Sequence, residues 1–525
     1  MISPQQSSSR LNDLEKNWDA IIVGGGITGA GIFRELSRMG YHILLLDQTD
    51  FAFGTSSRSS KLVHGGLRYL ANAQFQVTYE SVREREHLQQ EFPDLVKPLE
   101  FLIPIFERYK HGAAFFNMGL NLYDVFGGKW KHGRYALGEL ESVYPALNNQ
   151  ELQSVLYYYD AEVDDARLVM RVLQEGIAFG GEAINYCKAV ELLRDHTEMV
   201  RGVQVRDVLT GEEQELFASV IINATGPWTD ELRSQVINET VIRKLRGSHL
   251  LIPRERLPID HAFTLFHPRD GRALFLIPWQ GTTMVGTTDL DHPSSFEREK
   301  HEPFMTNQEM EYLLMAVNSI FPGSEIQASD ILSSFAGLRP IVTMGDMAPS
   351  KASRTHRIFS DKNLFSIAGG KLTTFQRMAA DLVHSILPLL PSLYDAKPSQ
   401  RDHQLPMTHE KVDGIRFARF SGIYGQHVHE FLDTASPEEL IPFRNSPYCP
   451  SEIRWAARHE QVHHLEDVLL RRTRLGLVTL QGAADLLPII RPILEQELGW
   501  DSGRWEKEKA TYLKLWKECY FLPSS

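Results

Sequence analysis

The sequence predicts an α/β protein with a discontinuous parallel-sheet domain, a second domain built on a mixed antiparallel sheet, and an all-α C-terminal domain. The first observation is a buried strand over 20–23 that breaks into a glycine turn and then a helical pattern. The second observation is that similar strand-to-glycine transitions follow at 219–226 and 364–374. The third observation is a change of periodicity, because short apolar runs within 273–286 indicate strands and the chain beyond 408 indicates helices.

The glycine turn after the first strand has the spacing that binds a dinucleotide. Gly24, Gly26 and Gly29 form G-x-G-x-x-G, which allows a tight turn, a close approach to a pyrophosphate, and close packing of helix on strand. The helix N-terminus offers unpaired N–H groups and a partial positive charge to phosphates. A second strand over 41–46 ends at Asp47, whose carboxylate is placed to accept hydrogen bonds from a ribose. Together these elements predict a Rossmann-like unit rather than an isolated glycine turn.

The dinucleotide motif serves both NAD and FAD, and the residues that follow favour FAD. The segment 55–61, TSSRSSK, is rich in hydroxyls and carries two cations, which suits a pyrophosphate and a ribityl chain. The alternative is a solvated loop, as most serine-rich stretches are. The strand ends at 224–226 and 370–374 argue against that alternative, because three such turns could face one cofactor from distant parts of the chain. A helix start near Gly370 could also stabilise negative charge on a reduced isoalloxazine ring.

Taken together, these motifs resemble those of the FAD-dependent glycerol-3-phosphate dehydrogenase family, within the D-amino-acid-oxidase-like flavoenzymes. The resemblance covers nearly the whole chain from about Lys16 onward and weakens between about 405 and 450. The matching motifs are GGGITGAG, TSSRSSKLVHGGLRYL, DDARLV, NATGPW, RGSHLLIP, LIPW, VGTTD, AGLRP, AGGKLTT and LEDVLLRRTRLGL. HGGLRYL, GGKLT and RRTRLGL are specific to the family, whereas NATG and GTTD recur in other flavoproteins.

The resemblance implies that FAD is the cofactor and that the matched motifs carry its binding residues. These are Gly24, Gly25, Gly26, Thr28, Gly29, Asp47, Thr55, Ser56, Ser57, Ser59, Ser60, Lys61, Leu62, His64, Gly65, Gly66, Ala224, Thr225, Gly226, Gly370, Lys371, Leu372 and Thr373.

The composition is that of a large globular enzyme and gives no reason to expect nucleic-acid binding. The chain has 525 residues, which suggests about three domains, and its formal net charge is −12. Its cysteines, Cys187, Cys449 and Cys519, are scattered without a C-x-x-C, so neither a zinc ribbon nor a redox-active dithiol is supported and no metal is expected. Scattered thiols suit a reducing compartment. No window approaches ~18 uncharged apolar residues, so no transmembrane helix is expected.

These patterns divide the chain into a tail and three domains. We expect a flexible tail over 1–14, an FAD-binding domain over 15–85, 159–232 and 336–398, a substrate domain over 86–158 and 233–335, and a helical C-terminal domain over 399–525.

The segment 106–135 is the part of the chain that could contact a membrane. It places Lys129, Lys131 and Arg134 beside aromatic and aliphatic residues, which suits the headgroup region of an anionic bilayer. The alternative is that its apolar face belongs to the core, and the residues alone slightly favour this alternative. The resemblance favours membrane contact, because it is to peripheral membrane dehydrogenases that pass electrons to quinone. We therefore expect a cytoplasmic protein bound peripherally to the cytoplasmic face of the membrane, and a homodimer.

The substrate that the resemblance implies, sn-glycerol 3-phosphate, sets the chemistry of the site. The site must bind a phosphate, remove a hydroxyl proton and give the carbon-bound hydride to flavin N5; phosphate recognition favours arginine, with lysine as a point charge. His64 and His249 are both candidates for the base, because imidazole titrates near working pH. Arg339 is also a candidate catalytic residue, because its charge could hold a developing alkoxide. The candidate substrate-binding residues are Arg68, Tyr69, Thr287, Arg339, Arg354 and Lys371.

The sequence therefore predicts FAD-dependent oxidation of sn-glycerol 3-phosphate to dihydroxyacetone phosphate, with electrons passed to a membrane quinone. A glycerol-3-phosphate oxidase that reduces O2 is the nearest alternative, because the matched motifs do not separate the two acceptors. An amine or amino-acid oxidase of the same superfamily would need cations only for a carboxylate, whereas four candidate cations favour a phosphate. A non-catalytic flavin-binding sensor is the alternative from a different class, and it would bind both ligands without reducing the flavin.

Overall fold

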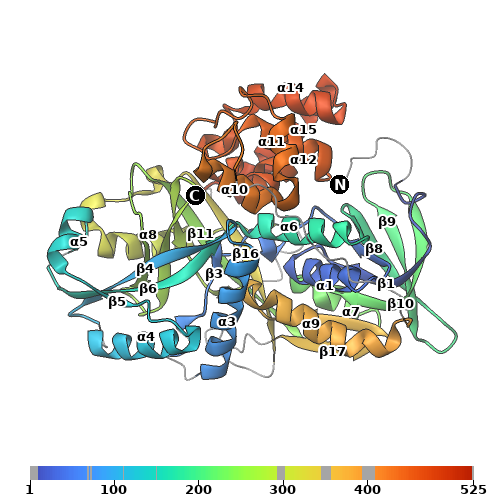
Figure 1. Ribbon diagram of the computed structural model, residues 1–525, viewed down its shortest axis with the longest axis horizontal. Coiled ribbons are helices and arrows are strands. Elements are labelled where there is room, and N and C mark those ends of the chain that lie inside the picture. Colours follow the sequence, from blue (N-terminus) through green and yellow to red (C-terminus); the bar gives the residue numbers. More distant parts are fainter. Residues whose placement is uncertain are drawn as a thin grey trace.

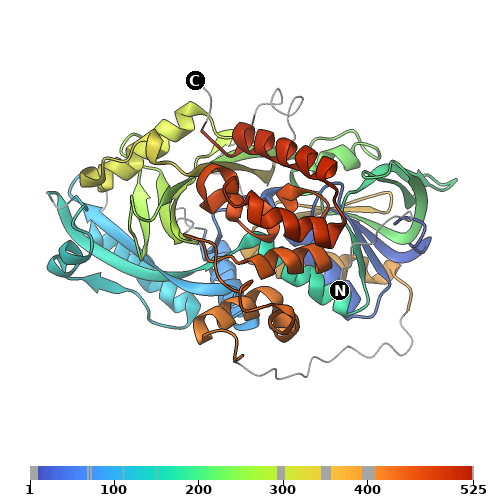
Figure 2. The same cartoon turned by 90° about the horizontal axis from the view of Figure 1, so that it is seen from above.

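The structure is a computed structural model that describes residues 10–67, 70, 74–109, 112–148, 150–292, 302–343, 356–392 and 408–522. Two sheets lie side by side, and the C-terminal helices lie over the junction between them (Figures 1 and 2). The α/β class, with a parallel sheet, a mixed antiparallel sheet and a helical C-terminal region, is the one expected from the sequence, and it is confirmed.

The first sheet contains the parallel strands expected from the glycine turns. Its order is β17-β18-β10-β1-β2-β7, and the antiparallel strands β9 and β8 continue from β10. The bounds are β1 (Asn17–Val23), β2 (Ile43–Leu46), β7 (Glu182–Ile184), β8 (Cys187–Arg194), β9 (Val200–Asp207), β10 (Glu213–Asn223), β17 (Arg357–Asp361) and β18 (Leu364–Ala368). Because β1, β2, β10 and β18 are parallel, Gly24, Asp47, Ala224 and Gly369 follow their carboxyl ends at one edge, where α/β sheets bind ligands.

Helices cover one face of this sheet, and the β8–β9 pair covers the other. The helices are α1 (Ile27–Arg38), α6 (Asp165–Ala178) and α9 (Phe375–Ile386), and α1 contacts both of the others. Their apolar residues share one core with β1 and β2, whereas Leu192 of β8 packs with Ile21 and Leu44 on the opposite side. All residues of β2 are buried, which explains its unbroken apolar sequence.

The second sheet is antiparallel apart from the β4–β12 pair. Its order is β15-β11-β14-β13-β12-β4-β6-β3, with β16 paired to β11 and β5 paired to β6. The bounds are β3 (Leu62–Val63), β4 (Val96–Phe106), β5 (Gly133–Tyr135), β6 (Leu152–Val163), β11 (Ile242–Pro253), β12 (Ala262–Phe266), β13 (Ala273–Trp279), β14 (Thr282–Gly286), β15 (Leu290–Asp291) and β16 (Ser333–Val342). The β11–β16 register places His249 opposite Phe335 and Leu245 opposite Arg339.

The remaining α-helices lie around the second sheet and in the C-terminal region, apart from α7, which contacts β10 and β18 of the first sheet. They are α3 (Phe75–Glu91), α4 (Ala113–Gly127), α5 (Leu137–Val143), α7 (Thr229–Arg233), α8 (Asn307–Ile320), α10 (Gly414–Tyr424), α11 (Val428–Thr434), α12 (Pro450–His459), α13 (Leu475–Val478), α14 (Leu487–Leu498) and α15 (Ser502–Cys519), and Asp467–Arg472 forms a π-helix. The C-terminal helices touch both sheet domains, because α10 contacts α6 while α13 and α15 contact β16.

Four of the expected domain boundaries fall inside helices or strands. The division after residue 85 lies within α3, and the division after residue 232 lies within α7. β6 runs through the division at 158 and β16 runs through the division at 336, so each strand connects the two sheet domains. The expectation of a flexible tail is wrong for residues 10–14. Leu11 is buried, and Arg10 Nε lies 3.1 Å from Oδ2 of Asp207, a buried carboxylate that needs a cation. The linker expected near 395–407 lies outside the described residues.

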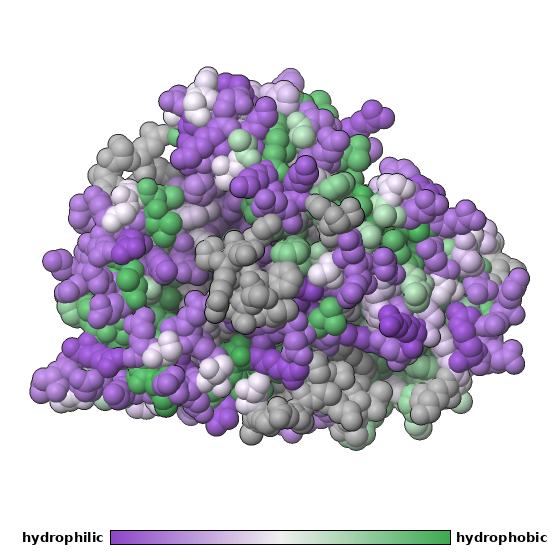
Figure 3. Space-filling model, turned by 180° about the vertical axis from the view of Figure 1, so that it is seen from behind, coloured by the Kyte–Doolittle hydropathy of each residue, from purple (hydrophilic) through white to green (hydrophobic). Residues whose placement is uncertain are grey.

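In the described part of the chain, no helix combines the length and apolar character needed to cross a bilayer. The face shown in Figure 3 is mainly hydrophilic, with apolar residues in separate patches.

Candidate active site

A cavity of about 380 Å³ lies at the carboxyl edge of the first sheet. Most of the residues expected to bind the cofactor line it. They are Gly24, Gly26, Thr28, Asp47, Thr55, Ser56, Ser59, Ala224, Thr225, Gly226, Gly370, Lys371 and Leu372.

Glycine is required at this edge because backbone segments approach one another closely. A Cβ on Gly29 would lie 1.9 Å from the carbonyl oxygen of Gly24, and a Cβ on Gly24 would lie 2.5 Å from that of Ala224. Gly24 also has a φ of 115°, which L side chains rarely adopt. The N-cap of α1 is Gly26, which has no side chain to cap the helix, so the helix start has the character of an anion-binding site. The glycine turn and the start of α1 together form a backbone cradle that fits a pyrophosphate.

Asp47 follows β2 and provides the carboxylate of the cavity. Its Oδ2 accepts a hydrogen bond of 2.7 Å from the Gly25 N–H, and its Oδ1 accepts one of 2.9 Å from the Thr49 N–H. Burial raises the pKa of Asp47 to about 6, although these hydrogen bonds oppose the rise. The carboxylate can accept further donors, which fits the hydroxyls of a ribose.

A second cavity, of about 810 Å³, adjoins the first on the side of the antiparallel sheet. The two cavities share Thr55, Ser59, Pro340, Gly370, Lys371 and Leu372 as lining residues. A ligand with a nucleotide at one end and a ring system at the other, such as FAD, fits two adjoining cavities of this kind. The other expected site residues that line the larger cavity are Ser60, Leu62, His64, Gly66, His249, Thr287, Arg339 and Thr373.

His249 lies on β11 in the wall of the larger cavity and is 2% exposed. Its Nε2 is 2.9 Å from Ser60 Oγ, and its ring stacks on Phe335 with centroids 4.7 Å apart. Nδ1 is buried and has no hydrogen-bond partner among the described residues. Burial, reinforced by the charges of Arg339 and Lys61, holds the pKa of His249 well below 6.5. The imidazole is therefore neutral at physiological pH and able to accept a proton.

Arg339 lies on β16, and its guanidinium is held in a fixed orientation. Nη2 donates to Thr287 Oγ1 at 2.9 Å, and Nη1 donates to Asp289 Oδ1 at 3.0 Å. The space for these contacts depends on Gly247, because a Cβ there would lie 2.3 Å from Arg339 Nη2. A second expected cation, Lys371, follows β18 and donates from Nζ to Ser81 Oγ of α3 at 3.0 Å.

The turn after His64 is held by a buried carboxylate that the sequence analysis did not identify. Asp160 lines the larger cavity, and its Oδ1 accepts hydrogen bonds from the Gly65 N–H at 3.0 Å and from Tyr123 OH at 2.5 Å. Arg85 Nη1 donates to the same oxygen at 2.7 Å. The histidine turn is thereby connected to both α3 and α4. No local motif marks Asp160, since its partners lie on other elements.

Several expected cofactor residues lie beside the cavities without lining them. Lys61 is the clearest case, because its buried ammonium lies 2.8 Å from Asp165 Oδ1 and also donates to the Ser57 carbonyl. Arg58 lies in the same loop. Its Nη2 is 2.8 Å from Glu302 Oε2 and donates a hydrogen bond to Tyr520 OH. Both cations of the loop are thus paired with protein carboxylates, although Arg58, unlike Lys61, also lines the larger cavity. The expected residues that line neither cavity are Gly25, Gly29, Ser57, Lys61 and Gly65.

Three expected site residues, Arg68, Tyr69 and Arg354, lie outside the described residues. Conversely, aromatic residues that the sequence analysis left unassigned line the two cavities. Phe53 and Trp228 line the smaller cavity, and Phe275 lines the larger one. Trp228 belongs to the NATGPW motif, which could have identified it, whereas Phe275 sits in a strand with no distinguishing signal. No metal-binding group of His, Cys, Asp or Glu is found among the residues that the structure describes.

Two family models match the chain and together span most of it. The first, described as FAD dependent oxidoreductase, matches residues 19–374, and the second, described as C-terminal domain of alpha-glycerophosphate oxidase, matches residues 365–505.

Individual relatives agree with these models. The aerobic glycerol-3-phosphate dehydrogenase of Staphylococcus epidermidis is 32% identical over 529 residues, which are 94% of this chain and 93% of that protein. The enzyme of the same name from Staphylococcus haemolyticus is 37% identical over 391 residues, or 73% of this chain and 70% of that protein. The solved structure of the glycerol-3-phosphate dehydrogenase from Bacillus halodurans, complexed with FAD, covers 95% of each chain with a TM-score of 0.74 and 27% identity. The chain therefore belongs to the FAD dependent oxidoreductases, in the family of FAD-dependent glycerol-3-phosphate dehydrogenases that its motifs resemble, and its cofactor is FAD.

Proposed function

We propose that this protein oxidises sn-glycerol 3-phosphate to dihydroxyacetone phosphate and passes the electrons to a membrane quinone. The observation that carries the proposal is the larger cavity, where His249, Arg339 and Lys371 line the space beside the flavin-binding edge. The names of the Staphylococcus relatives, aerobic glycerol-3-phosphate dehydrogenases, support this choice of substrate.

Arg339 and Lys371 are proposed to bind the phosphate. An arginine can present two N–H donors to phosphate oxygens, and a lysine adds a compact charge. Asp289 offsets part of the Arg339 charge and, with Thr287, fixes the direction of the guanidinium. Such fixed donors stabilise a dianion, or a developing alkoxide, without reorganising during the reaction. Arg68 and Arg354 stay candidates for the same role.

His249 is proposed to take the hydroxyl proton of the substrate. A neutral imidazole accepts a proton, and the contact of Nε2 with Ser60 Oγ fixes the plane of the ring. His64, which lines the same cavity, is the alternative base. Bound FAD supplies the acceptor, at N5, for the hydride that leaves the carbinol carbon. The apolar wall of the cavity limits water at that position.

Helix α4 is proposed to contact the membrane and to give the quinone access to the flavin. Met118 and Val125 of this helix are 65% and 57% exposed, and both also line the larger cavity. Trp130, just beyond the helix, is 70% exposed and is followed by Lys131. Exposed apolar side chains beside cations suit a bilayer interface. Location at the cytoplasmic face and a homodimer, which sedimentation equilibrium would measure, belong to the same proposal.

The proposal is tested by adding sn-glycerol 3-phosphate anaerobically to the purified FAD-loaded protein and following the flavin absorbance. Bleaching that a quinone analogue reverses quickly, and air slowly, is the expected result. Quick reversal by air would replace the quinone with O2 as acceptor. A flavin that stays oxidised would remove the substrate assignment, and amines or amino acids would then be tried as substrates. Flotation with anionic vesicles tests the membrane contact, with Met118→Ser as the variant expected to float less.

A further inference from the structure

The RRTR sequence at 471–474 brings buried arginines of the C-terminal region against the FAD-binding domain. Arg471, Arg472 and Arg474 are each no more than 1% exposed. A buried guanidinium is costly unless carboxylates pair with it, so the carboxylates that these arginines contact show what the arrangement holds in place.

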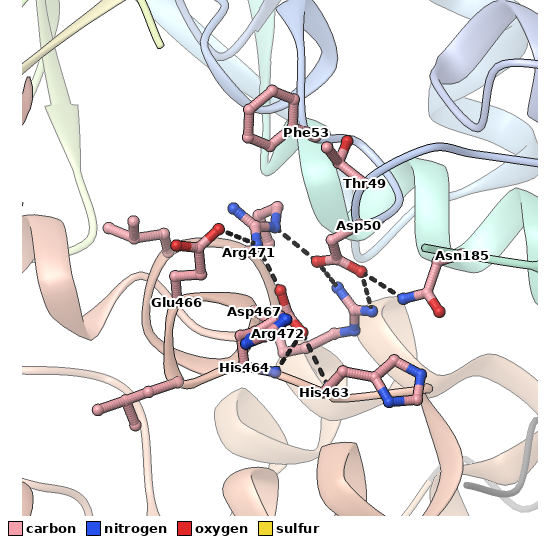
Figure 4. Close-up of polar contacts among 12 residues, drawn as sticks. Thr49, Asp50, Phe53, Asn185, His463, His464, Glu466, Asp467, Arg471 and Arg472 are labelled. Atoms are coloured by element: carbon pink, nitrogen blue, oxygen red, sulfur yellow. Dashed lines mark hydrogen bonds and ion pairs between the residues drawn. The ribbon is translucent and has the colours of Figure 1, made fainter. Parts of the chain in front are cut away.

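Arg471 and Arg472 bind Asp50, which begins the loop 50–59 between β2 and β3. Arg472 places Nη1 2.7 Å from Asp50 Oδ2 and Nη2 2.7 Å from Oδ1, in a bidentate arrangement, and Arg471 Nε lies 2.5 Å from Oδ2 (Figure 4). Asn185 Nδ2 donates to Oδ1 at 2.9 Å. The Asp50 carboxylate is fully buried, and its donors converge on it from the C-terminal region and from the sheet domain.

Arg474 holds the other end of the same loop through Asp165. Its Nη2 lies 2.7 Å from Asp165 Oδ1 and 2.8 Å from Asp164 Oδ1. Asp165 Oδ2 in turn accepts hydrogen bonds from the Ser59 N–H at 3.0 Å and from Ser59 Oγ at 2.7 Å. One tetrapeptide of the C-terminal region therefore anchors the loop at both Asp50 and Ser59.

The part of the loop between these anchors forms the wall of the smaller cavity. Phe53, Gly54, Thr55, Ser56 and Ser59 all line it. The Arg471 guanidinium lies 5.8 Å from the centre of the Phe53 ring, so the anchor and the cavity wall contact each other directly.

The arginines are themselves fixed by their own domain. Arg471 Nη2 lies 2.5 Å from Asp467 Oδ1, and Arg472 Nη2 donates to the Glu460 carbonyl at 2.7 Å. Asp467 Oδ2 also accepts the His463 and His464 N–H groups, as Figure 4 shows. The donors that reach Asp50 are therefore preorganised rather than flexible.

We propose that Arg471, Arg472 and Arg474 are positioning residues for the cofactor, through which the C-terminal domain holds the loop 50–59 in its FAD-binding conformation. A loop that is ordered before the ligand arrives saves the entropy of ordering it on binding, which appears as affinity. Because the inference concerns FAD binding, it holds whatever the substrate of the enzyme is.

The test compares two conservative variants of the full-length holoenzyme. Arg472→Lys keeps a positive charge but loses the bidentate contact with Asp50. Arg419→Lys is the matched control, because Arg419 donates to the buried Glu452 at 2.8 Å within the C-terminal region and lines neither cavity. The FAD dissociation constant is measured from the rise in flavin fluorescence on serial dilution of each holoenzyme. Melting temperatures are recorded with and without excess FAD.

Arg472→Lys is expected to raise the FAD dissociation constant about tenfold, equivalent to about 1.4 kcal/mol. Its melting temperature should fall more in the FAD-bound form than in the apoprotein, since ligand stabilisation depends on affinity. Arg419→Lys should lower both melting temperatures equally and leave the dissociation constant unchanged. If Arg472→Lys does not fold, Asp50→Asn carries the same expectations, because it removes the charge at the other side of the contact. A folded variant whose dissociation constant stays within twofold of the parent, or changes as much as that of Arg419→Lys, would overturn the proposal.

Discussion

The two adjoining cavities are built from different materials. The smaller one is formed largely by backbone, with Gly24, Gly26 and the strand end at Ala224 brought together by parallel strands. The larger one is formed by side chains of the mixed sheet, such as His249 and Arg339, and by the apolar face of α4. A backbone cradle tolerates almost no added atoms, whereas a side-chain site tolerates new shapes but not lost functional groups. The two cavities should therefore fail in different ways when mutated.

Gly29→Ala should have the largest effect on FAD binding, because it adds an atom within the backbone cradle itself. The new Cβ would lie 1.9 Å from the Gly24 carbonyl oxygen, and no side-chain movement can relieve a clash with backbone. The turn must open, and we expect purified protein without bound FAD. The ratio of flavin absorbance to protein absorbance measures the result. Gly138→Ala is the control, since a Cβ there meets no atom within 4 Å. Normal flavin content in Gly29→Ala would show that the cofactor does not depend on this turn.

The same contrast explains how much the sequence alone could predict. The strands at 20–23 and 364–368 and the glycine turns were predictable because their signals are local: short apolar runs followed by glycines. The confirmed family and cofactor rest on those motifs. The contact of Asp160 with Gly65 was not predictable, because strand pairing and packing bring it about across the chain. The pairing of Lys61 with Asp165 was missed for the same reason, although both residues lie in recognised motifs. The roles assigned to individual site residues stay predictions.

His249→Asn tests the side-chain cavity and should lower kcat by about 10²–10⁴-fold, the usual contribution of a general base. FAD should stay bound, since His249 does not line the smaller cavity. Burial, with Arg339 and Lys61, holds the pKa of His249 well below 6.5, so the acidic limb of kcat/KM in the parent enzyme should also lie well below pH 6.5. His64→Asn is the comparison that decides between the two bases. A variant His249→Asn with parental kcat, beside an inactive His64→Asn, would assign the base to His64.

Arg339→Lys should have an intermediate effect, because the charge remains while the oriented pair of donors is lost. We expect kcat/KM for the phosphorylated substrate to fall about tenfold to a hundredfold, comparable to the loss of one well-placed donor. The contacts with Thr287 and Asp289 need the planar fork of arginine, and lysine cannot make both. Steady-state kinetics with sn-glycerol 3-phosphate and, as control, with unphosphorylated glycerol give the answer. Equal losses for both substrates would place Arg339 away from the phosphate.

The smallest effect is expected from pH acting on the smaller cavity through Asp47. A ribose hydroxyl donates to an ionised carboxylate, so FAD binding favours the deprotonated form. Burial raises the pKa of Asp47 to about 6, so the carboxyl of the free protein gains its proton as the pH falls below 6. FAD affinity should then fall by up to about tenfold per pH unit, the limit for one linked proton, and stay constant above pH 7. Fluorescence titration of FAD between pH 5 and 8 measures this. In Asp47→Asn the affinity should be lower and lack this pH dependence, whereas a slope that persists in the variant would assign the proton to another group.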